Sequence, residues 1–388
     1  MFIPYARQSI SDQDIAAVSE VLRSDFLTQG PAIPNFETAL ATYCGAKHAV
    51  AVNSATSALH IACLALGVGP GDIVWTNPIS FVASANCALY CGAKVDFVDI
   101  DPDTFNISVA ALTAKLEQAK KSGSLPRVVI PVHLAGQSSD MAAIHALAQD
   151  YGFKIIEDAS HAVGGTYNGS PVGSCLYSDI TVLSFHPVKI ITSGEGGMAL
   201  TNSASLSAAM ERLRSHGITR DKNLFQHAPD GPWYYEQIDL GLNYRLTDIA
   251  AALGLSQFQR LDSFVARRNE IARDYDSLFS GSIFTTPTIH DDVISAFHLY
   301  VIRMAFTGDQ KQRFFELAHK NGVGLNVHYI PIYRQPYYSQ MGFDSADFPV
   351  AERYYSEAVS IPMYADLTFE QQQHVASVLI STAATVSQ

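Results

Sequence analysis

The chain has 388 residues, of which 48% are hydrophobic and 16% charged; this is typical of a globular protein with a sizeable core and allows two domains. Its net charge is −12 and its basic residues are scattered, which argues against a nucleic-acid partner. No apolar run approaches about 18 residues and the first residues lack the apolar stretch of a signal peptide, so we expect no membrane partner and a cytoplasmic protein.

The five cysteines show neither a CxxC pair nor the spacing of a metal site. Cysteine is commonly buried as a free thiol, and a reducing compartment keeps it in that state. We therefore expect free thiols, and no metal, at Cys44, Cys63, Cys87, Cys91 and Cys175.

Residues 1–35 are interpreted as an arm that leads into the main domain. Ser11 and the acidic residues after it are typical of a helix start, and apolar residues recur at helical spacing from Ile15 to Leu22. Gly30 and Pro31 cannot continue this helix, so a loop is predicted at residues 26–31.

Between residues 48 and 201, short apolar runs alternate with helical stretches. Strands are predicted at residues 49–52, 72–76, 94–99, 127–133, 154–158, 179–185 and 197–201. Helices are predicted at residues 55–66, 80–91, 108–121 and 139–151. This alternation predicts an α/β fold with a mostly parallel sheet that is covered on both faces.

The last two strands of this series have a different connection. Only about ten residues separate Phe185 from Gly197, which is too few for a crossover helix. The seventh strand should therefore run antiparallel to the sixth, which gives a seven-stranded, mostly parallel sheet with one antiparallel strand. Lys189 lies in this reversal of the chain.

The rest of the chain predicts a second domain. A helix is expected at residues 204–215, a long loop without periodicity at 216–245 and one long helix at 247–278. Helices and strands mix from residue 283 onward, which is typical of a small α+β domain. With a boundary near residue 260, we predict a large domain with its arm at 1–260 and a small C-terminal domain at 261–388.

A lysine and an aspartate, Lys189 and Asp158, each come at the end of a buried strand. An enzyme that uses pyridoxal phosphate (PLP) needs such a pair, because the lysine amine bonds to the cofactor and the aspartate pairs with the pyridinium nitrogen. Neither residue is specific alone, since a lysine at a strand end is most often a solvated surface residue.

Five segments together are far more specific, and they follow one another along nearly the whole chain. They are residues 53–60 (NSATSALH), 157–162 (EDASHA), 184–189 (SFHPVK), 194–197 (GEGG) and 241–248 (GLNYRLTD). In these segments the sequence resembles the DegT/DnrJ/EryC1/StrS family of sugar-nucleotide aminotransferases. The resemblance implies the fold of the fold-type I PLP-dependent transferases and the cofactor pyridoxal 5′-phosphate.

The resemblance also implies cofactor contacts. The backbone amides of Ala55 and Thr56, at a helix start, and the hydroxyl of Ser184 would bind the phosphate. Phe81 would stack on the pyridine ring, and Asp158 would keep its nitrogen protonated.

Lys189 would hold the cofactor and then move a proton as the catalytic base. His161 and His186 would orient Asp158, touch the cofactor oxygen or only fill space, and the sequence leaves these roles open. Asn243 matches a segment that reaches the partner's cofactor phosphate in the family, which implies a homodimer with shared active sites. A helix cap before Thr247 is the alternative.

Substrate contacts are implied on the arm, in the lysine segment and in the small domain. These residues are Tyr5, Leu27, Thr28, His186, Asn326, Val327, His328 and Tyr329. A connecting loop and a buried strand are the structural alternatives for the first and last groups.

Within the family, residues 77–81, 184–189 and 326–333 look most similar to the transaminases of pseudaminic acid biosynthesis. This resemblance implies transfer of an amino group from L-glutamate to C4 of a UDP-linked 2-acetamido-2,6-dideoxy-4-keto-hexose. Another nucleotide-linked keto sugar, dTDP-linked or 3-keto, is the alternative, and a catalytically silent regulatory protein of the same fold is a third. Family members that dehydrate C3 carry histidine at the lysine position, so Lys189 disfavours that reaction.

Overall fold

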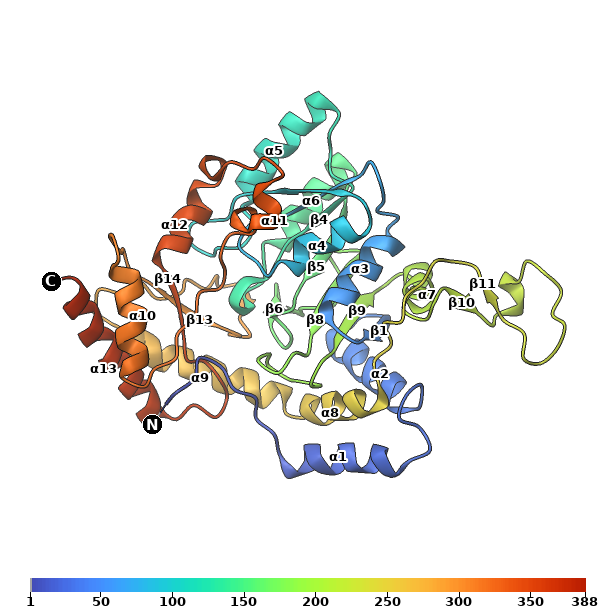
Figure 1. Ribbon diagram of the computed structural model, residues 1–388, viewed down its shortest axis with the longest axis horizontal. Helices are drawn as coiled ribbons and strands as arrows, with labels where there is room; N and C mark the ends of the chain where they lie inside the picture. Colours follow the sequence, from blue (N-terminus) through green and yellow to red (C-terminus); the bar gives the residue numbers. More distant parts are fainter. Residues whose placement is uncertain (1) are drawn as a thin grey trace.

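A seven-stranded sheet forms the centre of the molecule (Figure 1). A computed structural model describes residues 2–388. The strands of the sheet are β1 (His48–Val52), β2 (Ile73–Thr76), β3 (Lys94–Phe97), β4 (Val128–Ile130), β5 (Lys154–Asp158), β8 (Ile180–Ser184) and β9 (Gly197–Thr201). They lie in the order β1-β9-β8-β5-β4-β2-β3. Only β9 within this sheet runs antiparallel to its neighbours, which confirms the predicted mixed sheet.

The register of the sheet brings together segments that are far apart in the sequence. Gly197, at the start of β9, pairs with Val52 at the end of β1 and with Ser184 at the end of β8. Because β5 lies parallel to β8, Asp158 reaches the same edge. The loops after β1, β5 and β8 therefore begin side by side.

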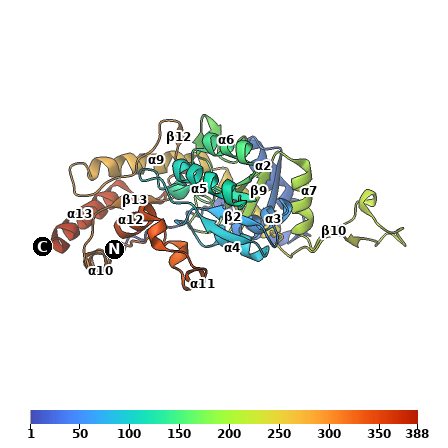
Figure 2. The same cartoon turned by 90° about the horizontal axis from the view of Figure 1, so that it is seen from above.

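Helices cover both faces of the sheet (Figures 1 and 2). Alternate strand residues point to opposite faces, so Val50 and Val182 belong to one core and Ala51 and Leu183 to another. The first core includes residues of α3 (Ala55–Ala65), α4 (Ala83–Tyr90) and α7 (Ala204–Leu213). The other face is covered by α2 (Ala32–Cys44), α5 (Val109–Ser122), α6 (Met141–Tyr151) and α8 (Asp248–Phe258).

The C-terminal part builds a core of its own around an antiparallel pair of strands, β13 (Tyr300–Arg303) and β14 (Ala358–Ile361). Its helices are α9 (Leu261–Leu278), α10 (Gln310–Lys320), α11 (Pro336–Ser339), α12 (Pro349–Glu357) and α13 (Phe369–Val386). Ile3 enters this core, so the N-terminal arm is bound to the C-terminal part. The arm continues into α1 (Asp12–Arg23), which packs along α8.

Residues 216–245 form an extension that projects from the body on the side opposite α13 (Figures 1 and 2). Two short strands, β10 (Ile218–Thr219) and β11 (Glu236–Gln237), pair antiparallel within it. The extension carries strongly exposed apolar side chains, with Trp233 68% and Leu240 88% exposed. A further small sheet is formed by β6 (Thr166–Tyr167), β7 (Ser170–Pro171) and β12 (Val293–Ile294).

Two predicted details were wrong. The single helix expected at 247–278 is divided into α8 and α9, because Arg260 leaves helical geometry while its guanidinium binds the carboxylate of Asp14 at 2.6 Å. No helix was predicted for α2, because Gly30 and Pro31 indicated a loop at residues 26–31. Pro31 and Pro34 both lie at the start of this helix, where a missing amide hydrogen costs nothing.

The predicted domain boundary near residue 260 falls between α8 and α9. We retain 1–260 and 261–388 as proposed domains. Within residues 2–388, the helices lack the combination of length and apolar composition that crossing a membrane requires.

Candidate active site

A cavity of about 690 Å³ opens at the edge of the sheet where the loops after β1, β5 and β8 begin. Its wall includes Lys189 and Asp158 together with the start of α3. Residues of the C-terminal part and of the N-terminal arm close the other side. A concave site of this size is large enough for a cofactor or a small-molecule substrate.

Lys189 lies in the predicted reversal between β8 and β9. The backbone amide of Lys189 donates a hydrogen bond to the carbonyl of His186, and the amide of Phe185 donates to the carbonyl of Gly196. These two bonds close the loop tightly. Burial lowers the pKa of the Lys189 amine to about 8, although the nearby carboxylate of Asp158 opposes this effect. The amine is therefore much more often neutral near pH 8 than that of an ordinary lysine.

Asp158 is only 4% exposed, and its two oxygens are held in place. One accepts a hydrogen bond from the Ser84 hydroxyl at 2.6 Å, and the other accepts from the amide of Ser160 at 3.2 Å. The carboxylate is thus fixed at the cavity wall by α4 on one side and by its own loop on the other.

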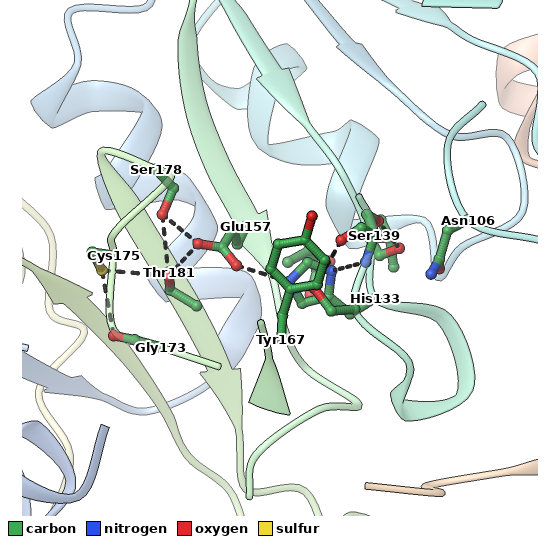
Figure 3. Close-up of polar contacts among 12 residues, drawn as sticks. Asn106, His133, Ser139, Glu157, Tyr167, Gly173, Cys175, Ser178 and Thr181 are labelled. Atoms are coloured by element: carbon green, nitrogen blue, oxygen red, sulfur yellow. Dashed lines mark hydrogen bonds and ion pairs between the residues drawn. The ribbon is translucent and has the colours of Figure 1, made fainter. Parts of the chain in front are cut away.

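The residue before it, Glu157, is the neighbour of Asp158 on β5 and therefore points to the opposite face of the sheet. There it accepts hydrogen bonds from Ser178, from Thr181 at 3.0 Å and from Nε2 of His133 at 2.8 Å (Figure 3). Burial raises the pKa of Glu157, but these donors outweigh it and lower the pKa overall. A carboxylate held in this way anchors β5 directly behind Asp158.

The start of α3 forms an anion cradle on β9. Ser54 caps the helix, because its hydroxyl accepts the amide hydrogen of Ser57. The amides of Ala55 and Thr56, in the first turn, have no hydrogen-bond acceptor within residues 2–388. A Cβ added at Gly197 would lie 2.4 Å from the nitrogen of Ala55, so only glycine lets the cradle sit this close to the sheet.

His161 and Tyr329 form a pair on the far wall. Nδ1 of His161 accepts the amide hydrogen of Ala135, so the ring proton is on Nε2, which lies 3.1 Å from the Tyr329 hydroxyl. Burial and the proximity of Lys189 and His328 hold the pKa of His161 well below its usual value. His161 is therefore a neutral donor to Tyr329, whose own hydrogen is free to point into the cavity.

Two more histidines enter from the C-terminal part. His328 is fixed by Ser360 at 2.9 Å, and its pKa is lowered to about 4 by burial and by Lys189. His298 packs on His161 with ring centroids 4.3 Å apart, and its Nδ1 is buried without a partner within residues 2–388. His298 was not among the predicted site residues, because its only signal in the sequence is a histidine at the start of an apolar strand.

Most of the predicted site residues line the cavity. They are Tyr5, Ala55, Thr56, Phe81, Asp158, His161, Ser184, His186, Lys189, His328 and Tyr329. Phe81 is 58% exposed at the rim, 6.3 Å from the Tyr329 ring.

The other predicted residues lie outside the cavity wall. Leu27 and Thr28 pack beside the start of α8, where Thr28 forms a β-bridge with Thr247. Asn243 forms a β-bridge with Ser215 and is not among the residues that line the cavity. The side chain of Asn326 contacts Nε2 of His328 and accepts the amide hydrogen of Val327. Asn326 therefore positions His328 and does not line the cavity itself.

The donor set fits the predicted cofactor. Free helix amides suit a phosphate, a fixed carboxylate suits a protonated ring nitrogen, and a partly neutral amine suits an aldehyde carbon. Histidine, cysteine and acidic side chains within residues 2–388 form no cluster arranged for a metal ion.

Relatives of known name match almost the full length of the chain. The spore coat polysaccharide biosynthesis protein SpsC of Bacillus subtilis is 40% identical, over 95% of this chain and 93% of its own. The UDP-4-amino-4,6-dideoxy-N-acetyl-beta-L-altrosamine transaminase of Campylobacter jejuni is 39% identical, over 98% of this chain and 97% of its own.

Solved structures show the same fold. Helicobacter pylori PseC, an aminotransferase involved in the biosynthesis of pseudoaminic acid, has a TM-score of 0.90 at 34% identity and covers 99% of this chain and 100% of its own. A second solved structure is described as the PLP form of a putative sugar aminotransferase, Spr1654 of Streptococcus pneumoniae. Its TM-score is 0.90 at 29% identity, and 100% of both chains is covered.

A family model matches residues 8–380. The cavity that Lys189 and Asp158 share agrees with this match and with the relatives above. The chain belongs to the DegT/DnrJ/EryC1/StrS aminotransferase family of PLP-dependent enzymes.

Proposed function

We propose that this aminotransferase moves an amino group from L-glutamate to C4 of a UDP-linked 2-acetamido-2,6-dideoxy-4-keto-hexose, as a step in pseudaminic acid biosynthesis. The names of the Campylobacter and Helicobacter proteins support the substrate and the pathway. The observation that carries the chemistry is the meeting of an amine, a carboxylate and a helix-start anion cradle in one cavity.

Three groups would hold the cofactor. The amides of Ala55 and Thr56, with the hydroxyl of Ser184, would bind its phosphate, and Phe81 would cover its ring from the rim. Asp158 would keep the ring nitrogen protonated. When bound, the cofactor supplies an electron-withdrawing ring that stabilises negative charge on the amino carbon.

Lys189 would then act as the base. Its lowered pKa makes the neutral amine available near pH 8, where it can take a proton from the amino carbon of glutamate and later return one to the sugar carbon. Asp158 would favour the charged form that Lys189 adopts each time it takes up a proton, before it passes that proton on.

The far wall would bind the sugar. His161, His328 and Tyr329 are uncharged there because burial and Lys189 disfavour imidazolium, while Tyr329 keeps its hydroxyl hydrogen. Neutral donors and acceptors suit hydroxyl and acetamido groups. Tyr5, whose ring lies 5.4 Å from His328, would close this wall from the arm.

The enzyme would work as a homodimer in the cytoplasm. Asn243 lies outside its own Lys189 cavity, which supports the proposal that it serves the partner's phosphate site. Leu27 and Thr28 would lie over the substrate, as the family resemblance implies. The five free thiols are in keeping with a reducing compartment.

An aminotransferase for a different nucleotide-linked keto sugar is the second candidate. SpsC, the relative at 40% identity, is named for spore coat polysaccharide and not for pseudaminic acid. The fold and the Lys189 site serve either reaction equally, because the sugar and the base are recognised by loop contacts.

One assay panel separates the two candidates. UDP-linked and dTDP-linked sugars, each as the 3-keto and the 4-keto form, are incubated with L-glutamate and enzyme, and NMR locates the new amine. We expect the UDP-linked 4-keto sugar to react with the highest kcat/KM and Lys189→Ala to be inactive. Amination only at C3, or only of a dTDP-linked sugar, would contradict the proposal.

A further inference from the structure

One arginine of the C-terminal part is buried without an acidic partner. Arg268, on α9, is only 2% exposed, and it does not line the cavity. Burial lowers the pKa of its guanidinium to about 10, and no carboxylate within residues 2–388 opposes this effect. The group still carries its charge at neutral pH. A buried cation without an acid is costly to a fold, so the position of Arg268 needs an explanation.

Three backbone carbonyls take the place of an acid. Nη1 of Arg268 donates to the carbonyl oxygen of Phe297 at 3.0 Å and to that of His298 at 3.3 Å. The carbonyl of Met363 accepts from the same nitrogen at 3.1 Å. Within residues 2–388, none of these three oxygens accepts a hydrogen bond from another group. Because a charged donor makes stronger hydrogen bonds than a neutral one, the guanidinium ties two separate segments of the chain to α9.

The first segment carries His298 into the cavity wall. Phe297 has a φ of 43°, which is uncommon for a residue with a side chain and has to be held in place by its surroundings. Its amide donates to the hydroxyl of Ser295 at 3.1 Å, and its carbonyl is bound by Arg268. The ring of His298 then lies against that of His161, with centroids 4.3 Å apart.

The loop that holds His161 packs against the same segment. This loop contains the short helix η1 (Leu134–Gly136), and the carbonyl of Ala135 accepts the amide hydrogen of Leu299 at 3.2 Å. The amide of Ala135 in turn donates to Nδ1 of His161 at 3.2 Å. His298 is therefore held by α9 and by η1 together, and a displacement of its segment would reach His161.

The second segment holds the N-terminal arm. The amide of Met363 donates to the carbonyl of Tyr5 at 3.0 Å, while the carbonyl of Met363 accepts from Arg268. Tyr5 lines the cavity, and its ring lies 5.4 Å from that of His328. Arg268 thus supports two residues of the cavity wall, Tyr5 and His298, that come from distant parts of the chain.

We propose that Arg268 is a positioning residue for the substrate side of the cavity, where it fixes His298 and Tyr5 through the backbone segments that carry them. An arginine suits this task, because its planar head presents several donors in a fixed geometry. The anion cradle and Asp158 lie on α3 and β5 and make no contact with these bonds, so cofactor binding should not depend on them. The effect on substrate binding rests on the proposed function, whereas the bonds themselves do not.

Amide hydrogen exchange of the holoenzyme tests the role of the bonds without any substrate. Arg268→Met removes every donor and keeps a long side chain. The amides of Met363 and Leu299, whose own hydrogen bonds secure the two segments, should then exchange about tenfold faster. Mass spectrometry with residue-level fragmentation measures both amides. Unchanged exchange at either amide would overturn the proposal that Arg268 holds both segments.

Arg267→Met is the matched control. Arg267 lies on the same helix and also donates to a backbone carbonyl, that of Leu367 at 2.8 Å, but neither residue lines the cavity. Exchange at the amides of Met363 and Leu299 should stay within about twofold of the unchanged protein. Equal acceleration in the two variants would show a general loosening of α9 and would overturn a role specific to Arg268.

Steady-state kinetics test the positioning role itself. In Arg268→Met we expect the KM for the UDP-linked 4-keto sugar to rise about tenfold while kcat stays within about threefold, because the wall is displaced and the base is not. Affinity for pyridoxal phosphate, measured by fluorescence titration, should stay within about twofold. An unchanged KM, or an equal loss of cofactor affinity, would overturn the positioning role.

Two further outcomes are kept apart by this design. If the unchanged enzyme aminates none of the UDP-linked sugars, the proposed function fails, and the exchange rates still decide whether Arg268 holds the two segments. If Arg268→Met does not fold, Arg268→Gln takes its place, since its shorter amide cannot reach both segments. Native exchange at both Met363 and Leu299 in that variant would overturn the proposal.

Discussion

At the scale of single residues, the protonation of Lys189 is set by two opposing effects. Burial favours the neutral amine, and the carboxylate of Asp158 favours the ammonium ion; burial dominates and the pKa is about 8. The neutral amine is the nucleophile toward an aldehyde. The pH at which Lys189 reacts therefore reports the balance of these two effects.

We predict that the rate of pyridoxal phosphate attachment to the cofactor-free protein rises with pH and levels off above about 8. At pH 7 the rate should be about tenfold below the plateau, because only a minor fraction of the amine is neutral. Stopped-flow absorbance measures the rate, and the reaction of butylamine with the cofactor corrects for the cofactor's own titration.

Asp158→Asn provides the paired measurement. Loss of the carboxylate removes the group that favours the ammonium ion, so the midpoint for Lys189 should move to lower pH. A midpoint near 10.5 in the unchanged protein, or a shift to higher pH in the variant, would show that burial does not control this amine.

Residue types and spacing predicted Lys189 and Asp158, because both follow apolar runs whose ends meet at one edge of a parallel sheet. The same reasoning did not find His298, which reaches His161 only through the packing of the C-terminal part against the large domain. The proton on Nε2 of His161 was likewise beyond prediction, since it depends on the amide of Ala135. Contacts between distant segments leave no local pattern.

At the scale of elements, the site depends on how closely α3 sits on β9. Gly197 pairs with both Val52 and Ser184, and its missing side chain leaves room for the backbone of Ser54 and Ala55. Small residues after β1 predicted an anion cradle, but the need for glycine across the sheet became clear only from the register.

We predict that Gly197→Ala weakens cofactor binding by displacing the cradle. The added methyl group would lie 2.4 Å from the nitrogen of Ala55 and 2.5 Å from the carbonyl carbon of Ser54, and a backbone cannot move aside as a flexible side chain can. Overpacking of this kind costs about 1–3 kcal/mol. Urea unfolding measures the stability, and cofactor fluorescence titration measures the affinity.

Gly69→Ala is the matched control, because the added methyl group would meet no atom within 4 Å and the backbone at this position is compatible with alanine. Its stability should stay within about 0.5 kcal/mol of the unchanged protein. Equal behaviour of the two variants would show that the cradle tolerates a side chain on β9.

At the scale of the whole molecule, the sheet topology was predictable and the packing of the C-terminal part was not. Strand–helix alternation and the short gap before Gly197 were enough for a mixed sheet, because both are local in the sequence. The connection of Ile3 to the C-terminal core, and the break between α8 and α9, depend on contacts between segments far apart in the chain.

The extension at residues 216–245 and Asn243 bear on the proposed dimer. Exposed Trp233 and Leu240 favour burial against another protein surface, and a second copy is the partner that the family resemblance implies. Asn243 lies near the end of this extension and outside its own Lys189 cavity. In a two-fold dimer, each site would then combine Lys189 of one protomer with Asn243 of its partner.

We predict that a mixture of two inactive variants, Lys189→Ala and Asn243→Ala, recovers activity after subunit exchange. Half of the dimers would be mixed, and each mixed dimer would contain one site with both native residues, so about a quarter of the normal activity should return. Mixing Lys189→Ala with Asp158→Asn is the control: both residues belong to one protomer's cavity, so no native site forms. If mass-tagged subunits exchange and the first mixture stays inactive, Asn243 does not serve the partner's site.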